Sequence, residues 1–201
     1  MSATTLAGPR WWLRVCAAGL AVFAAPALTA ELQRAGAAAQ TRAVPPPAEI
    51  GVAMPSARLQ GFGTMRFVGL PIYDVHLWSG AGFDASRYET QTFALELRYA
   101  RKLAGAAIAQ RSIAEMRRTG TLDDRQADAW QAAMTQAFPD VAPGDRLTGV
   151  HAPGEATRFF HNGRPTSAVA DPTFGRLFFG IWLAGTTSEP GLRRQLIGAG
   201  S

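Results

Sequence analysis

The chain has 201 residues, of which 47% are hydrophobic and 17% charged, with a formal net charge of +5. These proportions exclude disorder for most of the chain and suit one medium-sized domain rather than two. The basic residues include a single lysine, Lys102, and the arginines are interleaved with acids instead of forming runs. We therefore expect no nucleic-acid partner.

Residues 1–30 have the pattern of a secretory signal, with Arg10 and Arg14 ahead of an apolar stretch and small residues behind it,. The apolar core of about 11 residues is shorter than the roughly 20 that a helix needs to span a bilayer. We expect a cleaved signal peptide, no stable membrane span after cleavage, and a secreted, periplasmic protein. Cleavage would also remove Cys16, the only cysteine,.

Residues 31–56 are rich in alanine and contain three successive prolines at 45–47. Large apolar side chains are few, so the segment offers little surface to bury against the entropy cost of ordering. We predict a flexible lead-in over residues 31–56 and place the folded domain at residues 57–201.

The folded domain opens with patterns typical of β-strands. Residues 59–68 and 70–78 are rich in β-branched and aromatic residues and are separated by Gly69. The second of these segments has large side chains on both faces, so it should be an inner strand. Over residues 92–100 large apolar residues alternate with small or charged ones, which indicates a strand with one buried and one solvent-facing side.

The middle of the chain is predicted to be helical. The first helix covers residues 103–118, and a second follows and ends before Pro139,. Thr121 and Asp124 resemble a capping box at the start of the second helix. The first helix carries charged residues at spacings of four and three, which favours an exposed, ion-paired face. These residues are Arg111, Glu115 and Arg118.

Strand patterns return after the second helix. Asn162-Gly163 is typical of a tight hairpin turn. Asp171 and Pro172 suit the N-cap and first turn of a strongly apolar helix that reaches Trp182. A last short helix ends at Gly198. The predicted strands are 146–151, 157–161 and 166–170. This order of elements predicts an α+β fold with an antiparallel sheet covered on one side.

We expect neither a metal nor a cofactor. The three histidines are the only imidazoles available. If the hairpin turn centres on Pro153-Gly154, His161 lies opposite Arg146, roughly 16 Å along the strand from His151 and on the other face. The two glycines of the first strand lack the third glycine of a dinucleotide-binding fingerprint.

Three residues are candidates for ligand binding: Arg66, Tyr73 and Tyr99. Tyr99 lies on the apolar face of its strand, where a phenol needs either a protein partner or a ligand. A tight turn at residues 69–71 would bring Arg66 beside Tyr73, so that a guanidinium and a phenol could share a carboxylate. An ordinary surface arginine is the alternative for Arg66.

Seven short segments, followed by a C-terminal helix at 192–198, together resemble one known family. They are LQGFG (59–63), MRF (65–67), IYDVHLW (72–78), FALELRY (93–99), GDRL (144–147), DPTF (171–174) and IWL (181–183). Their order and spacing resemble the bacterial chalcone isomerase-like proteins over residues 57–198. The resemblance implies an open-faced β-sandwich, in which helices pack on one face of an antiparallel sheet and a ligand cleft lies between the layers.

The family also implies functions and residues. Its plant members include isomerases that close a flavonoid ring, proteins that bind fatty acids, and non-catalytic helpers. Tyr73 matches the tyrosine that contacts the ligand in fatty-acid-binding members. The family's arginine position corresponds to Met65, and a one-residue offset on a strand reverses the face. Either a bulge returns Arg66 to the cleft, or the anion site is lost.

Three functions follow as hypotheses. The first is a non-catalytic binder of a small amphipathic or carboxylate ligand such as a fatty acid, with Arg66 and Tyr73 at the head group and no catalytic residue. The second is an isomerase or intramolecular lyase that uses Tyr73 or Tyr99 as a general acid. The third is an accessory subunit of an envelope complex, with an envelope protein as its partner.

Overall fold

The computed structural model describes residues 44–198. Its six strands form one antiparallel sheet in which each strand pairs with the next in sequence. The strands are β1 (Arg58–Phe67), β2 (Leu70–Ser79), β3 (Phe93–Tyr99), β4 (Arg146–His151), β5 (Thr157–His161) and β6 (Arg164–Val169). The expected signal peptide, residues 1–30, lies outside the described residues.

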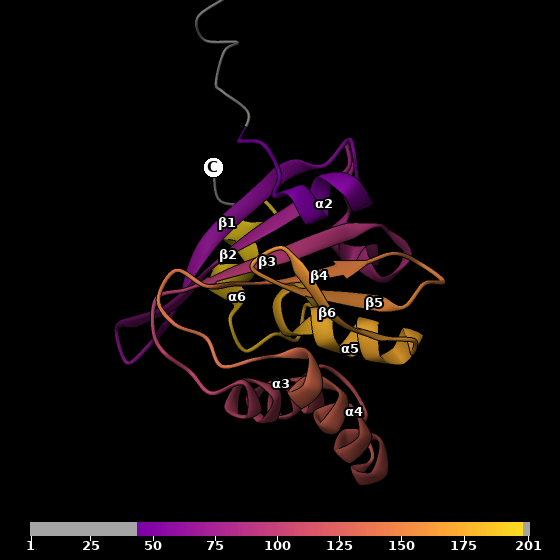
Figure 1. Ribbon diagram of the computed structural model, residues 1–201. Coiled ribbons are helices and arrows are strands. Elements are labelled where there is room, and N and C mark those ends of the chain that lie inside the picture. The colour runs from indigo at the N-terminus through magenta and orange to yellow at the C-terminus, as the bar shows by residue number, and fades with distance from the viewer. Residues whose placement is uncertain (1–43, 199–201) are drawn as a thin grey trace, which may run out of the picture. The chain divides into compact units, whose positions relative to one another are not determined.

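Four helices cover one face of this sheet (Figure 1). They are α3 (Gly105–Thr119), α4 (Asp124–Ala137), α5 (Pro172–Leu183) and α6 (Pro190–Leu196). A short 3-10 helix, η1 (Ala85–Thr90), connects β2 to β3. The arrangement is an open-faced β-sandwich, which confirms the predicted α+β class. Within the described part of the chain, the helices are all too short or too polar to cross a bilayer.

The helix starts test the capping predictions. Asp171 caps α5 as expected, because its carboxylate accepts hydrogen bonds from the backbone N–H groups of Thr173 and Phe174,. The capping box predicted at Thr121 is wrong. Asp123 caps α4 instead, accepting from the backbone N–H of Gln126 at 2.8 Å.

The hairpins fix the register of the sheet. Asn162 and Gly163 have φ angles of 50° and 82°, as the predicted tight turn between β5 and β6 requires. The predicted partner of His161 is wrong by one residue, because β4 pairs Leu147 with His161. Directly paired residues share a face, so His161 lies on the same side of the sheet as Leu147. His151 is four residues beyond Leu147 on β4, and an even spacing keeps the same face. The two histidines therefore lie on the same side of the sheet.

The predicted flexible lead-in contains an additional helix. Helix α2 (Ala48–Ala53) packs on the face of the sheet opposite α3 to α6, with Ile50 fully buried. The prediction of flexibility over 31–56 is therefore wrong for its last part. The segment is poor in apolar residues on average, but two of its side chains, Ile50 and Glu49, are buried. These two side chains hold it on the sheet. Ile50 joins a small core of Met54, Ala57, Trp78, Ala94 and Val150.

The buried carboxylates under α2 belong to a network of hydrogen bonds and ion pairs. Glu96 is 2% exposed and accepts from Trp78 Nε1 at 3.2 Å and from Arg146 Nη1 at 3.3 Å. The same Arg146 nitrogen lies 3.3 Å from a carboxylate oxygen of Glu49. The face of β3 predicted to meet solvent is therefore covered where Glu96 lies, because α2 lies over it.

Candidate ligand-binding cavity

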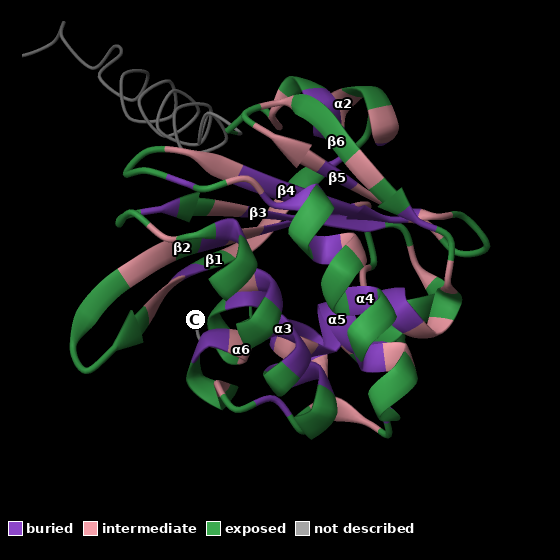
Figure 2. Ribbon diagram, turned by 60° about the horizontal axis from the view of Figure 1, so that its bottom comes forward, coloured by how far each residue is buried: buried purple, intermediate pink, exposed green. Residues whose placement is uncertain are grey.

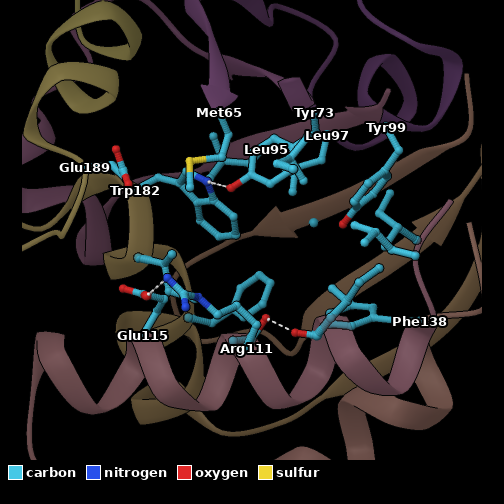
Figure 3. A pocket seen from close by; sticks show the side chains of 18 of the residues that line it. Met65, Tyr73, Leu95, Leu97, Tyr99, Arg111, Glu115, Phe138, Trp182 and Glu189 are labelled. Carbon is cyan, nitrogen blue, oxygen red and sulfur yellow. Dashed lines mark hydrogen bonds and ion pairs between the residues drawn. The ribbon is translucent and has the colours of Figure 1, made fainter. Parts of the chain in front are cut away.

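A cavity of about 330 Å³ lies between the sheet and the helices α3 and α5 (Figure 3). Its volume is at the low end of the roughly 300–1,000 Å³ that is typical of ligand pockets. Most of its wall is apolar, because the inward positions of β3 and the apolar stripe of α5 both face it. This wall includes Leu95, Leu97, Leu103, Phe138, Phe178 and Phe179.

Aromatic packing holds the α5 side of the wall in place. The rings of Phe178 and Phe179 meet edge to face with centroids 5.2 Å apart, and Phe179 meets Phe93 of β3 at 4.8 Å. Phe178 also packs edge to face on Phe159 at 5.2 Å. Such pairs contribute about 1 kcal/mol each beyond their buried area. These aromatic contacts thus hold the sheet and α5 together along one side of the cavity.

Charged residues gather at one end of the cavity, at α3 and the start of α6. Glu115 is buried, and its carboxylate lies 2.6 Å from Arg111 Nη2 and accepts from Ser188 Oγ at 2.7 Å. Arg118 lies 3.8 Å away. The predicted exposed, ion-paired face is thus wrong for Glu115, because the segment before α6 covers it. Glu189 lines the same end of the cavity.

Tyr73 lines the cavity from β2. Its hydroxyl oxygen accepts a hydrogen bond of 3.1 Å from Trp182 Nε1. Burial raises the pKa of Tyr73 to about 12, an effect that the Trp182 bond partly offsets and the negative charge of Glu189 increases. The phenol is therefore protonated at neutral pH, and it can donate its proton to a ligand oxygen.

Tyr99 lies beside Tyr73, its cross-strand partner on β3, with ring centroids 5.7 Å apart. Tyr99 is 3% exposed, and burial raises its pKa strongly. Figure 3 shows its hydroxyl turned into the cavity, on the side of Phe138 and away from Glu115. No residue within 44–198 forms a hydrogen bond with this hydroxyl, so a ligand oxygen can reach it.

Arg66 does not join the two tyrosines. The bulge between Met65 and Arg66 leaves Met65 paired with Tyr73 and facing the cavity. The Arg66 side chain is exposed, and its Nη1 donates to the carbonyl oxygen of Gly69 at 3.2 Å. The bulge therefore does not return Arg66 to the cleft, and the expected site shared by Arg66 and Tyr73 is not formed.

The cation in the cavity wall is Arg111, which the sequence placed in a surface ion pair. Residues on both sides of it, Ile108 and Ser112, also line the cavity. A helical periodicity could show that these positions share a face, but it could not show that this face meets a cavity. Within the described residues, no three side chains that commonly bind metals lie close enough together to hold an ion.

Fold and site define an α+β protein whose sheet and helices enclose an apolar cavity of ligand size with charges at one end. The chain belongs to the chalcone isomerase-like family, which it matches over residues 38–198. An uncharacterized protein of Haemophilus influenzae is 28% identical over 148 residues, which cover 73% of this chain and 71% of that protein.

A solved structure has the same fold. The crystal structure of a fatty-acid binding protein of Arabidopsis thaliana matches with a TM-score of 0.55 over 72% of this chain and 88% of that one. The two sequences are 12% identical. At this identity the likeness shows the fold alone.

Proposed function

We propose that the protein is a non-catalytic binder of a small amphipathic ligand, such as a fatty acid. The observation that carries the proposal is the gathering of charged residues at one end of an otherwise apolar cavity. An apolar tail would leave water and gain contacts with the apolar walls, which is favourable. The fatty-acid binding protein that shares the fold supports the same class of ligand.

Arg111 is the residue we propose for the head group. One of its nitrogens is used by Glu115, whereas a guanidinium carries five N–H donors. A ligand carboxylate or hydroxyl can therefore bond to Arg111 without breaking the existing ion pair. Tyr73 has a hydroxyl proton to donate, and Tyr99 offers a second polar contact to a ligand that carries an oxygen in its chain.

We also propose that the protein is secreted into the periplasm. The support is the signal-like pattern of residues 1–30,. N-terminal sequencing of the protein recovered from a periplasmic extract tests this directly. An N-terminus within residues 25–40 supports export, and recovery of the uncleaved chain from the cytoplasm contradicts it.

Binding is tested by native mass spectrometry and by calorimetric titration of the delipidated protein with dodecanoic acid. We expect a complex with one ligand per chain. Leu97→Phe fills the cavity from β3 and should weaken binding by about tenfold or more. Leu59→Phe is the matched control, because Leu59 packs on the opposite face of the sheet.

Two outcomes would contradict the proposal. The first is that no fatty acid, fatty alcohol or fatty amine binds to the delipidated protein. The second is that Leu97→Phe binds dodecanoic acid as tightly as the unaltered protein does, because the ligand would then lie outside the cavity.

The isomerase alternative requires a tyrosine hydroxyl open to the cavity, and Tyr99 provides one. Its raised pKa makes it a weak acid at neutral pH, however, and general acids work best with a pKa near the operating pH. The raised pKa of Tyr99 therefore favours binding over catalysis. The alternative of an accessory subunit in an envelope complex stays a prediction, which a pull-down from envelope extracts would test.

A further inference from the structure

The hairpin that joins β1 to β2 ends in an exposed apolar tip, which we define as residues 66–70. Phe67, Val68 and Leu70 are 62%, 84% and 52% exposed. Figures 1 and 2 show this hairpin extending past the rest of the sheet, and Figure 2 shows its end coloured as exposed. Three neighbouring large apolar side chains thus meet solvent at one projecting point.

The turn itself is strained in a way that another turn of the same protein avoids. Val68 and Gly69 have φ angles of 49° and 77°, close to the 50° and 82° of Asn162 and Gly163. Asparagine tolerates this left-handed backbone, whereas a β-branched residue there is a genuine outlier. The strained backbone at Val68 lowers the stability of the fold, and the exposed side chain contributes no burial to offset this. The requirements of folding therefore do not explain why valine occupies position 68.

Basic residues accompany the tip. Arg66 is part of it, and its guanidinium is held near the turn by the bond to the Gly69 carbonyl. Arg101 and Lys102 are exposed in the segment after β3. The Ala100 N–H donates to the Ile72 carbonyl at 2.9 Å, which fixes that segment beside the start of β2. The tip and its surroundings therefore combine apolar side chains with positive charge.

We propose that the hairpin tip docks on an anionic lipid bilayer, with Phe67, Val68 and Leu70 entering the headgroup region and Arg66, Arg101 and Lys102 contacting lipid phosphates. Apolar insertion and attraction of basic side chains to anionic lipid add together at a membrane surface. Phe67 also lines the cavity, so docking would bring one wall of the cavity to the bilayer. The inference concerns the empty protein and does not depend on the ligand.

The test is co-flotation of the full chain with vesicles of phosphatidylcholine alone or mixed with phosphatidylglycerol. Val68→Asn removes one inserted side chain and gives the turn the residue used at position 162. Val52→Asn is the matched control, because Val52 is 85% exposed on α2 and lies outside the tip. Any contribution of the N-terminal residues is common to all three proteins.

We expect binding to the vesicles that contain phosphatidylglycerol. Val68→Asn should weaken it by about tenfold, while its melting temperature stays the same or rises because strain is relieved. Val52→Asn should bind like the unaltered protein, and added salt should weaken binding. Loss of membrane binding without loss of stability is a result that a purely structural role of Val68 would not give.

Three results would overturn the proposal. Equal partitioning of Val68→Asn and Val52→Asn would show that the tip does not insert. Equal binding to both kinds of vesicle would show that the protein does not select an anionic bilayer. Sedimentation showing a dimer that Val68→Asn dissociates, without vesicle binding, would assign the tip to a second copy of the chain instead of to a membrane.

Discussion

The two faces of the sheet are closed in different ways. On the outer face, α2 covers a small core, and Arg146 joins the buried carboxylates Glu49 and Glu96 in one network. On the inner face, the helices leave a cavity of about 330 Å³. Its buried carboxylate, Glu115, pairs with Arg111, which is itself largely exposed.

The difference indicates that the outer face of the sheet contributes mainly to stability and the inner face mainly to ligand binding. Buried charges are tolerated where their partners are fixed and the remaining space is filled, as under α2. Native interiors otherwise contain few voids larger than a water molecule. Folding alone does not require a cavity of ligand size that is lined by the Tyr99 hydroxyl, which has no hydrogen-bond partner among residues 44–198. Substitutions on the outer face should therefore change stability, and substitutions around the cavity should change binding.

The largest effect is expected for Arg146→Met, which leaves the buried Glu49 without its guanidinium partner and leaves Glu96 with only the more exposed Arg98 as an ion-pair partner. The free energy of unfolding should fall by about 4 kcal/mol, measured by urea denaturation. Arg87→Met removes an exposed ion pair with Asp84 and serves as the control, with little or no loss of stability, because solvent screens the pair. Similar losses in the two variants would contradict a structural network under α2.

Ile50→Ala tests whether α2 belongs to the folded domain. The substitution removes a fully buried side chain and should cost about 3 kcal/mol, seen as a lower urea midpoint. Val52→Ala on the same helix changes an exposed residue and should stay within about 0.5 kcal/mol. If Ile50→Ala were equally neutral, α2 would be dispensable and the domain would begin at β1.

Alkaline pH should destabilise the protein through its buried phenols. Because the pKa of Tyr73 is raised to about 12 in the folded state, the unfolded chain loses this proton first as pH rises above about 10. Stability contributed by Tyr73 is complete below that pH and is lost between about pH 10 and 12, at about 1.4 kcal/mol per pH unit. Tyr73→Phe should flatten this dependence in urea titrations, and an unchanged slope would contradict it.

Glu115→Gln addresses the charged end of the cavity and should have the smallest effect. It removes one negative charge beside Arg111 but keeps an acceptor for Ser188. The affinity for dodecanoate should rise about fivefold, equivalent to about 1 kcal/mol, while the affinity for dodecanol stays constant in calorimetry. A weaker binding of dodecanoate would mean that Arg111 does not meet the head group.

Much of the fold could be predicted from local patterns. The strand β3, the Asn162-Gly163 turn and the Asp171 cap each depend on a few neighbouring residues, and each is present in the structure. Helix α2 could not be predicted in this way. Its order comes from Ile50 and Glu49 meeting strands that lie far away in the sequence, and composition does not report such contacts.

The site was predicted only in part, for a related reason. Tyr73 and Tyr99 lie on strands whose period of two shows which side chains share a face, and both line the cavity. Arg66 does not, because its neighbours Met65 and Phe67 both line the cavity and successive side chains of a strand point to opposite faces. Arg111 reaches the cavity through the docking of α3 on the sheet, which the helical pattern of its own segment cannot reveal.

The central claim, that the ligand lies between the sheet and the helices, is tested most directly by a crystal structure with dodecanoic acid that carries bromine at its terminal carbon. We predict an anomalous bromine peak inside the cavity, among Leu97, Phe138 and Phe178, with the carboxylate toward Arg111. A peak on the outer face of the sheet or at the hairpin tip, with the cavity empty at saturating ligand, would contradict the account.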